Sequence, residues 1–147
     1  MATKLADETH QHPAPIPYPY CYGCGSDNLV GLHLDFEFDG KELQARFIPL
    51  EQHQGYPGIV HGGVISSLLY EVMANIQRYS GDEAILRSSN VDFRRPVSVG
   101  KPLIVTARVV NETPNGWHLA AVLTNEFGRR LASATGEAIR PKQSDPA

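Results

Sequence analysis

A helical pattern of apolar residues in the middle of the chain, flanked on both sides by alternating patterns, most constrains the fold. After Gly62, apolar side chains recur at positions i, i+3, i+4, i+7, i+8 and i+11, as they do in a helix with one apolar face. Gly81 is suited to end such a helix. One long helix is therefore predicted to begin near Gly62, with its apolar stripe formed by Ile65, Leu68, Leu69, Val72, Met73 and Ile76.

The residues on either side of this helix have the alternation of strands. Apolar residues stand at every second position from Leu32 to Phe38, and Asp39-Gly40 follows as a two-residue turn signal. Residues 43–47 resume the alternation, which predicts a hairpin. Four more strands are predicted after the helix, at residues 84–93, 102–111, 117–125 and 130–140. This order predicts an α+β fold in which an antiparallel sheet wraps around one long central helix.

The composition is that of a soluble globular protein with one domain. Of the 147 residues, 41% are hydrophobic and 20% are charged, which is close to the average for globular proteins. The formal net charge of −3 and the lack of a basic face argue against nucleic-acid binding. No apolar run reaches the roughly 20 residues of a membrane span, and the N-terminus lacks the apolar core of a secretory signal. We therefore expect a cytoplasmic protein without nucleic-acid or membrane partners.

The two ends of the chain differ in composition from the middle. Residues 1–20 are rich in Pro and His and have few side chains that would fill a core, so they are predicted to form a flexible arm. Residues 141–147 are predicted to form a polar tail. The folded domain is expected over residues 21–140.

The start of the predicted helix, His61-Gly62-Gly63, is the most informative candidate site. The first N–H groups of a helix have no partner inside it, and the helix dipole there favours negative charge. Two glycines leave these N–H groups uncovered, so a thioester carbonyl would find donors for its developing oxyanion. The same residues also fit a glycine-rich turn needed for close packing, with His61 as a satisfied core residue. The residues alone leave both interpretations open.

Five motifs follow one another along the chain: Cys21-Tyr-Gly-Cys-Gly, Gly31-Leu-His-Leu, Gly58-Ile-Val-His-Gly-Gly-Val, Asn90-Val-Asp-Phe-Arg-Arg-Pro-Val and Ala134-Thr-Gly. Their order and spacing make residues 21–140 resemble the PaaI-like (phenylacetyl-CoA-type) acyl-CoA thioesterases, which have the hotdog fold. The resemblance implies a coenzyme A thioester as the substrate and no other cofactor. It also implies at least a homodimer, or a homotetramer, with the acyl chain between two protomers.

The resemblance implies catalytic roles for the start and the middle of the helix. The N–H of Gly62 would polarise the thioester carbonyl, and a carboxylate nine residues after His61 would act as nucleophile or general base. This chain has Tyr70 at that position and an acid, Glu71, one residue later. Because successive helical residues are turned by about 100°, Glu71 would need a shifted register or an unusual rotamer to replace the family's acid. The other interpretation of Glu71 is a solvated or dimer-facing acid.

Further candidate residues surround the helix start. Gln54, seven residues before His61, is the candidate for positioning a water molecule, and a plain loop residue is the alternative. Arg94 and Arg95 are candidates for the phosphates of coenzyme A, because arginine binds phosphate through a fork of donors; a solvated strand end is the alternative. The remaining candidates for ligand contact are Gly63, Val64, Leu68, Ser88, Asn90 and Phe93.

Cys21 and Cys24 have the spacing of a metal-binding pair, but a structural zinc site needs four ligands. The sequence has no second pair, and His33 alone does not complete the set. A site shared across a dimer is the remaining metal interpretation, and His10 and His12 in the arm are weaker ligands still. We expect no metal, and the family resemblance implies that the cysteine segment packs over the sheet.

Two functions remain open because Tyr70 replaces the family's carboxylate. The leading hypothesis is hydrolysis of an acyl-CoA thioester, with the oxyanion held at Gly62. The alternative is a hotdog protein that binds acyl-CoA with little or no turnover. Both hypotheses place the ligand at the same helix start, His61-Gly62-Gly63.

Overall fold

The structure, a computed structural model, describes residues 18–142. These residues form six strands and one long helix. The helix is α1 (Gly62–Tyr79), and a short 3₁₀ helix, η1 (Glu51–His53), precedes it. The predicted order of two strands, a helix and four strands is confirmed. The strands are β1 (Phe36–Phe38), β2 (Glu42–Phe47), β3 (Ile85–Phe93), β4 (Leu103–Thr113), β5 (Gly116–Asn125) and β6 (Arg130–Ile139).

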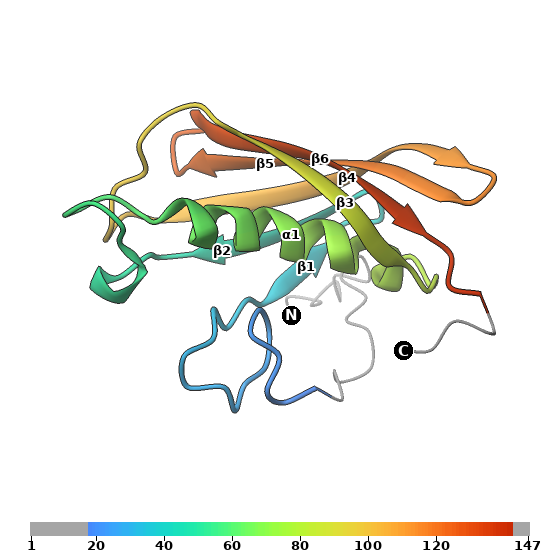
Figure 1. Ribbon diagram of the computed structural model, residues 1–147, viewed down its shortest axis with the longest axis horizontal. Coiled ribbons are helices and arrows are strands. Elements are labelled where there is room, and N and C mark those ends of the chain that lie inside the picture. Colours follow the sequence, from blue (N-terminus) through green and yellow to red (C-terminus); the bar gives the residue numbers. More distant parts are fainter. Residues whose placement is uncertain (1–17, 143–147) are drawn as a thin grey trace, which may run out of the picture.

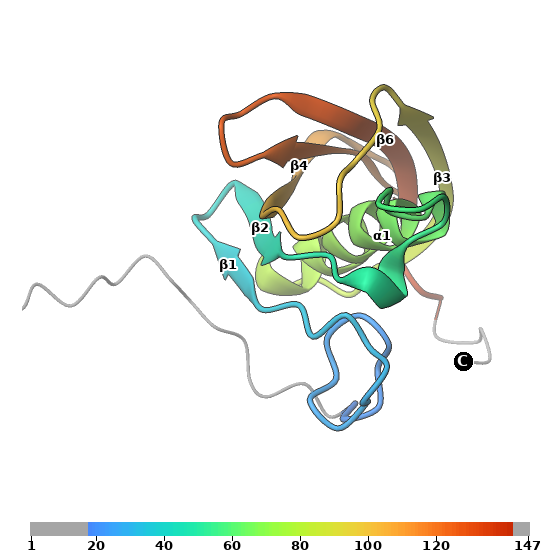
Figure 2. The ribbon, with the colours of Figure 1, turned by 90° about the vertical axis from the view of Figure 1, so that its left-hand side faces the viewer.

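The strands form a single antiparallel sheet in the order β1-β2-β4-β5-β6-β3. Helix α1 lies along the sheet in Figure 1, and the view in Figure 2 shows the sheet curving around it. The sheet ends at β3, which pairs with β6 on one side only. The start of α1 lies close to the end of β3, about 30 residues later in the chain, where the ring of Phe93 lies against Gly62.

The core lies between the concave face of the sheet and one face of α1. Buried and exposed residues alternate along β2, as expected for a strand with one face on the core. All six residues of the predicted helical stripe are buried, and Leu68 has an exposed fraction of 0%. The sheet covers this stripe, so the apolar period of the helix is explained by packing.

The first predicted strand is shorter in the structure than the alternation indicated. Leu32 and Leu34 are buried like strand residues, but their N–H groups donate to the carbonyls of Tyr22 (2.7 Å) and Gly23 (2.8 Å). His33, between them, has a φ of 53°, in the left-handed region. Alternating burial thus continues through a segment that pairs with a turn and not with β2.

Most of the predicted arm lies outside the described residues, and so do residues 143–147 of the predicted tail. The described part of the N-terminal segment, residues 18–31, contains turns and no helix or strand. In Figure 2 it lies below α1, on the side away from β4 and β6. Within residues 18–142, no helix is both long and apolar enough to cross a membrane.

Candidate functional site

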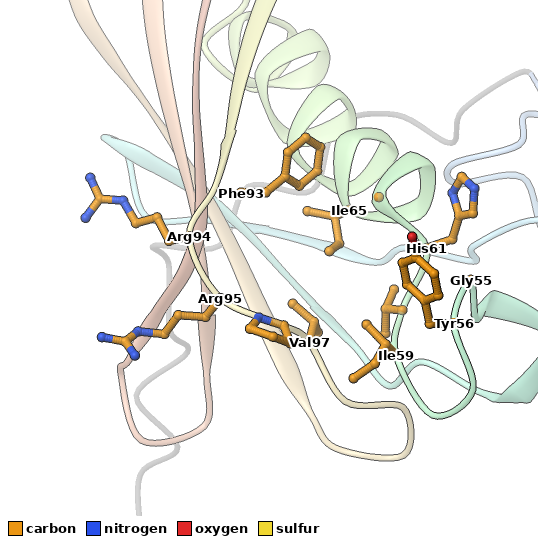
Figure 3. Close-up of a pocket in the computed structure, with 12 residues that line it drawn as sticks. Gly55, Tyr56, Ile59, His61, Ile65, Phe93, Arg94, Arg95 and Val97 are labelled. Atoms are coloured by element: carbon orange, nitrogen blue, oxygen red, sulfur yellow. The ribbon is translucent and has the colours of Figure 1, made fainter.

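A cavity of about 630 Å³ opens where the start of α1 meets the end of β3. Figure 3 shows its lining residues, which come from the loop before α1, from the first turn of α1, and from β3 and the segment after it. The sequence-predicted residues that meet here are His61, Gly62, Phe93, Arg94 and Arg95. The other lining residues are Gly55, Tyr56, Ile59, Val60, Ile65, Pro96 and Val97.

His61 is the N-cap of α1. Its backbone is extended, and its ring Nδ1 accepts a hydrogen bond from the N–H of Gly63 at 2.8 Å. Its own N–H donates to the carbonyl of His53 at 2.8 Å, which anchors the helix start to η1. The side chain is exposed, so the interpretation of His61 as a satisfied core residue gives way to that of a cap. The cap also occupies the N–H of Gly63.

The N–H of Gly62 differs from that of Gly63. Among residues 18–142, no acceptor for the Gly62 N–H is found. The ring of Phe93 lies against Gly62, since a Cβ built on this glycine would be 3.4 Å from the ring edge. Gly62 therefore presents an available donor at the cavity wall, beside an aromatic ring that is 53% exposed.

Gln54 is engaged in the loop before the helix. Its side-chain oxygen accepts a hydrogen bond from the N–H of Gly58 at 2.9 Å, and its backbone pairs with Val60 in an isolated bridge. Gly58 has a φ of 77°, which suits a glycine at this turn. Gln54 does not line the cavity. The structure thus gives it a role in holding the loop, and its role toward water stays a prediction.

Tyr70 and Glu71 lie on α1 outside the cavity. Tyr70 is 47% exposed. The carboxyl group of Glu71 packs against Gly23, where a Cβ would overlap it, and Oε2 of Glu71 accepts a hydrogen bond from Asn75 at 3.2 Å. Burial raises the pKa of Glu71 above its ordinary value, while the bond from Asn75 acts in the opposite direction. No carboxylate among the described residues lines the cavity.

Arg94 and Arg95 directly follow β3, and the backbone N–H groups of both donate to the carbonyl of Leu131, each at 3.0 Å. Figure 3 shows their guanidinium groups pointing outward, away from His61. Nε of Arg94 also lies 3.6 Å from Oδ2 of Asp92, and both side chains of this ion pair are exposed. Arg95 lines a second cavity of about 380 Å³ next to the first, together with Lys101 and Arg129. Three cations therefore border this neighbouring cavity.

The other predicted ligand contacts lie elsewhere. Ser88 and Asn90 line a separate cavity of about 460 Å³ between β3, β5 and β6, with the pair His118–Glu137 at its edge. Val64 is half-buried against the core, and the fully buried Leu68 faces the sheet. None of these four residues, nor Gly63, lines the cavity at Gly62.

Sequence reasoning missed much of the cavity wall. Tyr56 and Ile59 come from a loop, where no periodicity marks an apolar residue as functional. Ile65 belongs to the helical stripe, which was interpreted as core only, but this residue both packs in the core and lines the cavity. Lys101 and Arg129 are isolated cations in the sequence, so only the folded sheet brings them near Arg95.

The fold is similar to the folds of several solved structures. A thioesterase superfamily protein, RHA08564, has a TM-score of 0.77 at 22% identity; the match covers 82% of this chain and 60% of that one. The PaaI protein of the E. coli phenylacetic acid degradation operon has a TM-score of 0.70 at 22% identity, over 76% of this chain and 81% of that one. The smu.793 protein of Streptococcus mutans UA159, bound to acetyl CoA, has a TM-score of 0.69 at 18% identity, over 76% and 91%.

The sequence itself identifies the family. No curated protein matches the chain by sequence. A sequence profile of the thioesterase superfamily does match, over residues 57–132, which is more than half of the 147 residues and includes the whole of α1. This chain therefore belongs to the thioesterase superfamily and has the hotdog fold of PaaI, as its motifs indicated.

Proposed function

We propose that this protein hydrolyses acyl-CoA thioesters in the cavity at the start of α1. The observation that carries the proposal is the Gly62 N–H, which has no acceptor within residues 18–142 and belongs to the wall of a cavity of about 630 Å³. A thioester carbonyl oxygen bound there accepts this hydrogen bond. Water then adds to the carbonyl carbon, and the thiolate of coenzyme A leaves and takes up a proton. One such preorganised donor is worth about 10²–10³ in rate.

The second cavity supports the part of the proposal that concerns coenzyme A. Arg95, Lys101 and Arg129 border it, and it shares Arg95 with the first cavity. Arginine and lysine bind phosphate oxygens through charge-assisted hydrogen bonds. We assign the acyl group to the cavity at Gly62 and the phosphates to these cations. That a structural neighbour holds acetyl CoA supports the assignment.

The alternative is a protein that binds acyl-CoA with little or no turnover. One observation favours it: no carboxylate among residues 18–142 lines the cavity, and the Glu71 carboxyl group packs against Gly23. Loss of a general base costs about 10²–10⁴ in rate. In the homodimer that the family resemblance implies, a second protomer would complete the acyl site.

Substitution of Gly62 tests the oxyanion donor directly. Proline is favoured at the first position of a helix, and His61, with ψ at 137°, has the backbone that precedes proline. Gly62→Pro therefore removes the N–H while keeping the helix start, and it is expected to lower kcat/KM by about 10²–10³. Gly62→Ala is the matched control because it adds a Cβ but keeps the donor. Wild-type turnover by Gly62→Pro would rule out the proposed role of this N–H.

Assays with short-chain, medium-chain and aromatic acyl-CoAs separate the two functions. Tyr70→Asp restores an acid at the family's position, and Glu71→Ala removes the neighbouring one. If the wild type binds these thioesters without turnover and Tyr70→Asp gains hydrolysis, the natural protein is a binding protein. If the wild type is active and Glu71→Ala abolishes that activity without lowering Tm, Glu71 acts in catalysis despite its contact with Gly23.

A further inference from the structure

The fold brings a third group to the Cys21–Cys24 pair. Both cysteines are free, and their sulfur atoms are 3.4 Å apart. A carboxylate oxygen of Glu71 lies with the two sulfur atoms in a group whose members are all within 4.8 Å of one another. The pair comes from the turn segment before β1, and Glu71 comes from the middle of α1. None of the three residues lines the cavity at Gly62.

The distance between the two sulfur atoms fits two ligands around one ion. Tetrahedral zinc has bonds of about 2.3 Å to sulfur and about 2.0–2.2 Å to carboxylate oxygen, so its ligand atoms lie about 3.4–3.8 Å apart. Two sulfur atoms in a disulfide are only about 2.05 Å apart. The Cys21–Cys24 separation of 3.4 Å is therefore close to the spacing of two ligands.

The glycines of the motif make this arrangement sterically accessible. Gly23 is buried between the two cysteines, and a Cβ at this position would overlap the Glu71 carboxyl group. Gly25 closes the turn by donating its N–H to the carbonyl of Cys21 at 2.9 Å. A Cβ on Gly25 would overlap the carbonyl of Pro19. The turn is thus shaped so that a carboxylate from the helix can reach the two thiols.

The charges of the cluster also favour a cation. Two thiols and a carboxylic acid lie side by side, and a divalent cation bound among them would stabilise their thiolate and carboxylate forms at once.

We propose that Cys21, Cys24 and Glu71 bind a zinc ion that ties the N-terminal turn segment to helix α1. The two thiols lose their protons to solvent as the thiolates coordinate, and the carboxylate of Glu71 coordinates as an anion. Thiolate ligands select zinc over calcium and magnesium. Water or a further side chain takes the fourth position. The expectation of no metal was based on the lack of further ligands in the sequence, and the proposal departs from it because α1 supplies a third ligand.

Metal titration of the full-length protein tests the site without any measurement of activity. Reduced protein, stripped of metal with a chelator, is titrated with Co²⁺ and then with Zn²⁺ in competition. We expect one equivalent of cobalt to give a thiolate-to-cobalt charge-transfer band that zinc abolishes, and zinc to raise Tm. Cys21→Ser and Cys24→Ser should each lose most of the band. Glu71→Gln should weaken zinc binding at least about 10-fold, while Glu51→Gln, an exposed control, should not.

Several results would overturn the proposal. One is a reduced, folded protein, checked by circular dichroism, that binds neither metal. Another is a pair that oxidises to a disulfide and binds no zinc once it is reduced again. Unchanged zinc affinity in Glu71→Gln would show that Glu71 is not a ligand and would overturn the three-residue site. His10 and His12 lie outside the described residues, and His10→Ala/His12→Ala tests them: unchanged affinity leaves the three-residue site as proposed, and complete loss of binding overturns it. Turnover of acyl-CoA can succeed or fail independently of these results.

Discussion

His53 links the loop before the helix to the strand that precedes it. Its ring Nδ1 accepts a hydrogen bond from the N–H of Leu50 at 2.9 Å, and the ring packs against Phe47 with centroids 5.1 Å apart. Its carbonyl accepts the N–H of His61, the helix cap. This side chain therefore supports the position of the cavity wall without lining the cavity itself, and its environment suits the neutral imidazole.

The stability of the fold should fall in mild acid because of His53. Burial lowers the pKa of His53 below its ordinary value, so the unfolded chain binds a proton more readily than the folded one. The stability that this group contributes is present above the unfolded pKa of about 6.5 and is lost as pH falls through it. Thermal unfolding should give a lower Tm at about pH 5.5 than at about pH 7.5.

Asparagine at this position separates the imidazole from other acid effects. In His53→Asn the amide oxygen can still accept the Leu50 N–H, but the side chain no longer titrates. The variant should lose part of the difference in Tm between the two pH values. Gln52→Asn, on an exposed and non-titrating residue of the same 3₁₀ helix, is the control and should keep it. An unchanged pH dependence in His53→Asn would contradict the assignment.

At the scale of the element, α1 has three different surroundings. Its apolar stripe packs under the sheet, its first turn borders the cavity, and the side that carries Glu71 meets the turn segment of Cys21 and Cys24. Successive residues of a helix point about 100° apart. Tyr70 and Glu71 therefore face different surroundings although they are adjacent in sequence.

Truncation of the helix distinguishes core residues from ligand contacts. Leu68→Ala is expected to lower the free energy of unfolding by about 2–5 kcal/mol, because a buried leucine leaves a cavity under the sheet. Val64→Ala is the matched control on the same helix and should cost less, since Val64 is only half-buried. Urea denaturation with unchanged m-values measures both. A Leu68→Ala variant of wild-type stability that binds acyl-CoA more weakly would instead support its role as a ligand contact.

At the scale of the whole molecule, β3 forms an edge of the sheet without a second partner strand among the described residues. The four residues 87–90 in its centre are all exposed, so neither face of this part of the strand is covered. A long unpaired edge of this kind promotes association with another chain. The edge supports the homodimer that the family resemblance implies.

Sedimentation velocity measures the predicted assembly, and the wild type is expected to be at least a dimer at micromolar concentration. In a two-fold pairing of β3 with its copy, Ser89 at the strand centre lies near its own counterpart. Ser89→Glu would place like charges opposite each other and should shift the protein toward monomer. Thr106→Glu, on β4 in the interior of the sheet, serves as the control. A wild type that sediments as a monomer would refute the dimer.

The sequence by itself determined the order of strands and helix and the helix start at Gly62. Burial on one face imposes a period of two on strands and of about 3.6 on helices, and both periods are visible in the residues. The family followed from motifs that are local, and the sequence profile confirms it. Tertiary structure alone decided that Leu32 and Leu34 pair with a turn, and that Arg95, Lys101 and Arg129 border one cavity. It also decided that Glu71 meets Cys21 and Cys24, because contacts between distant segments leave no period in the sequence.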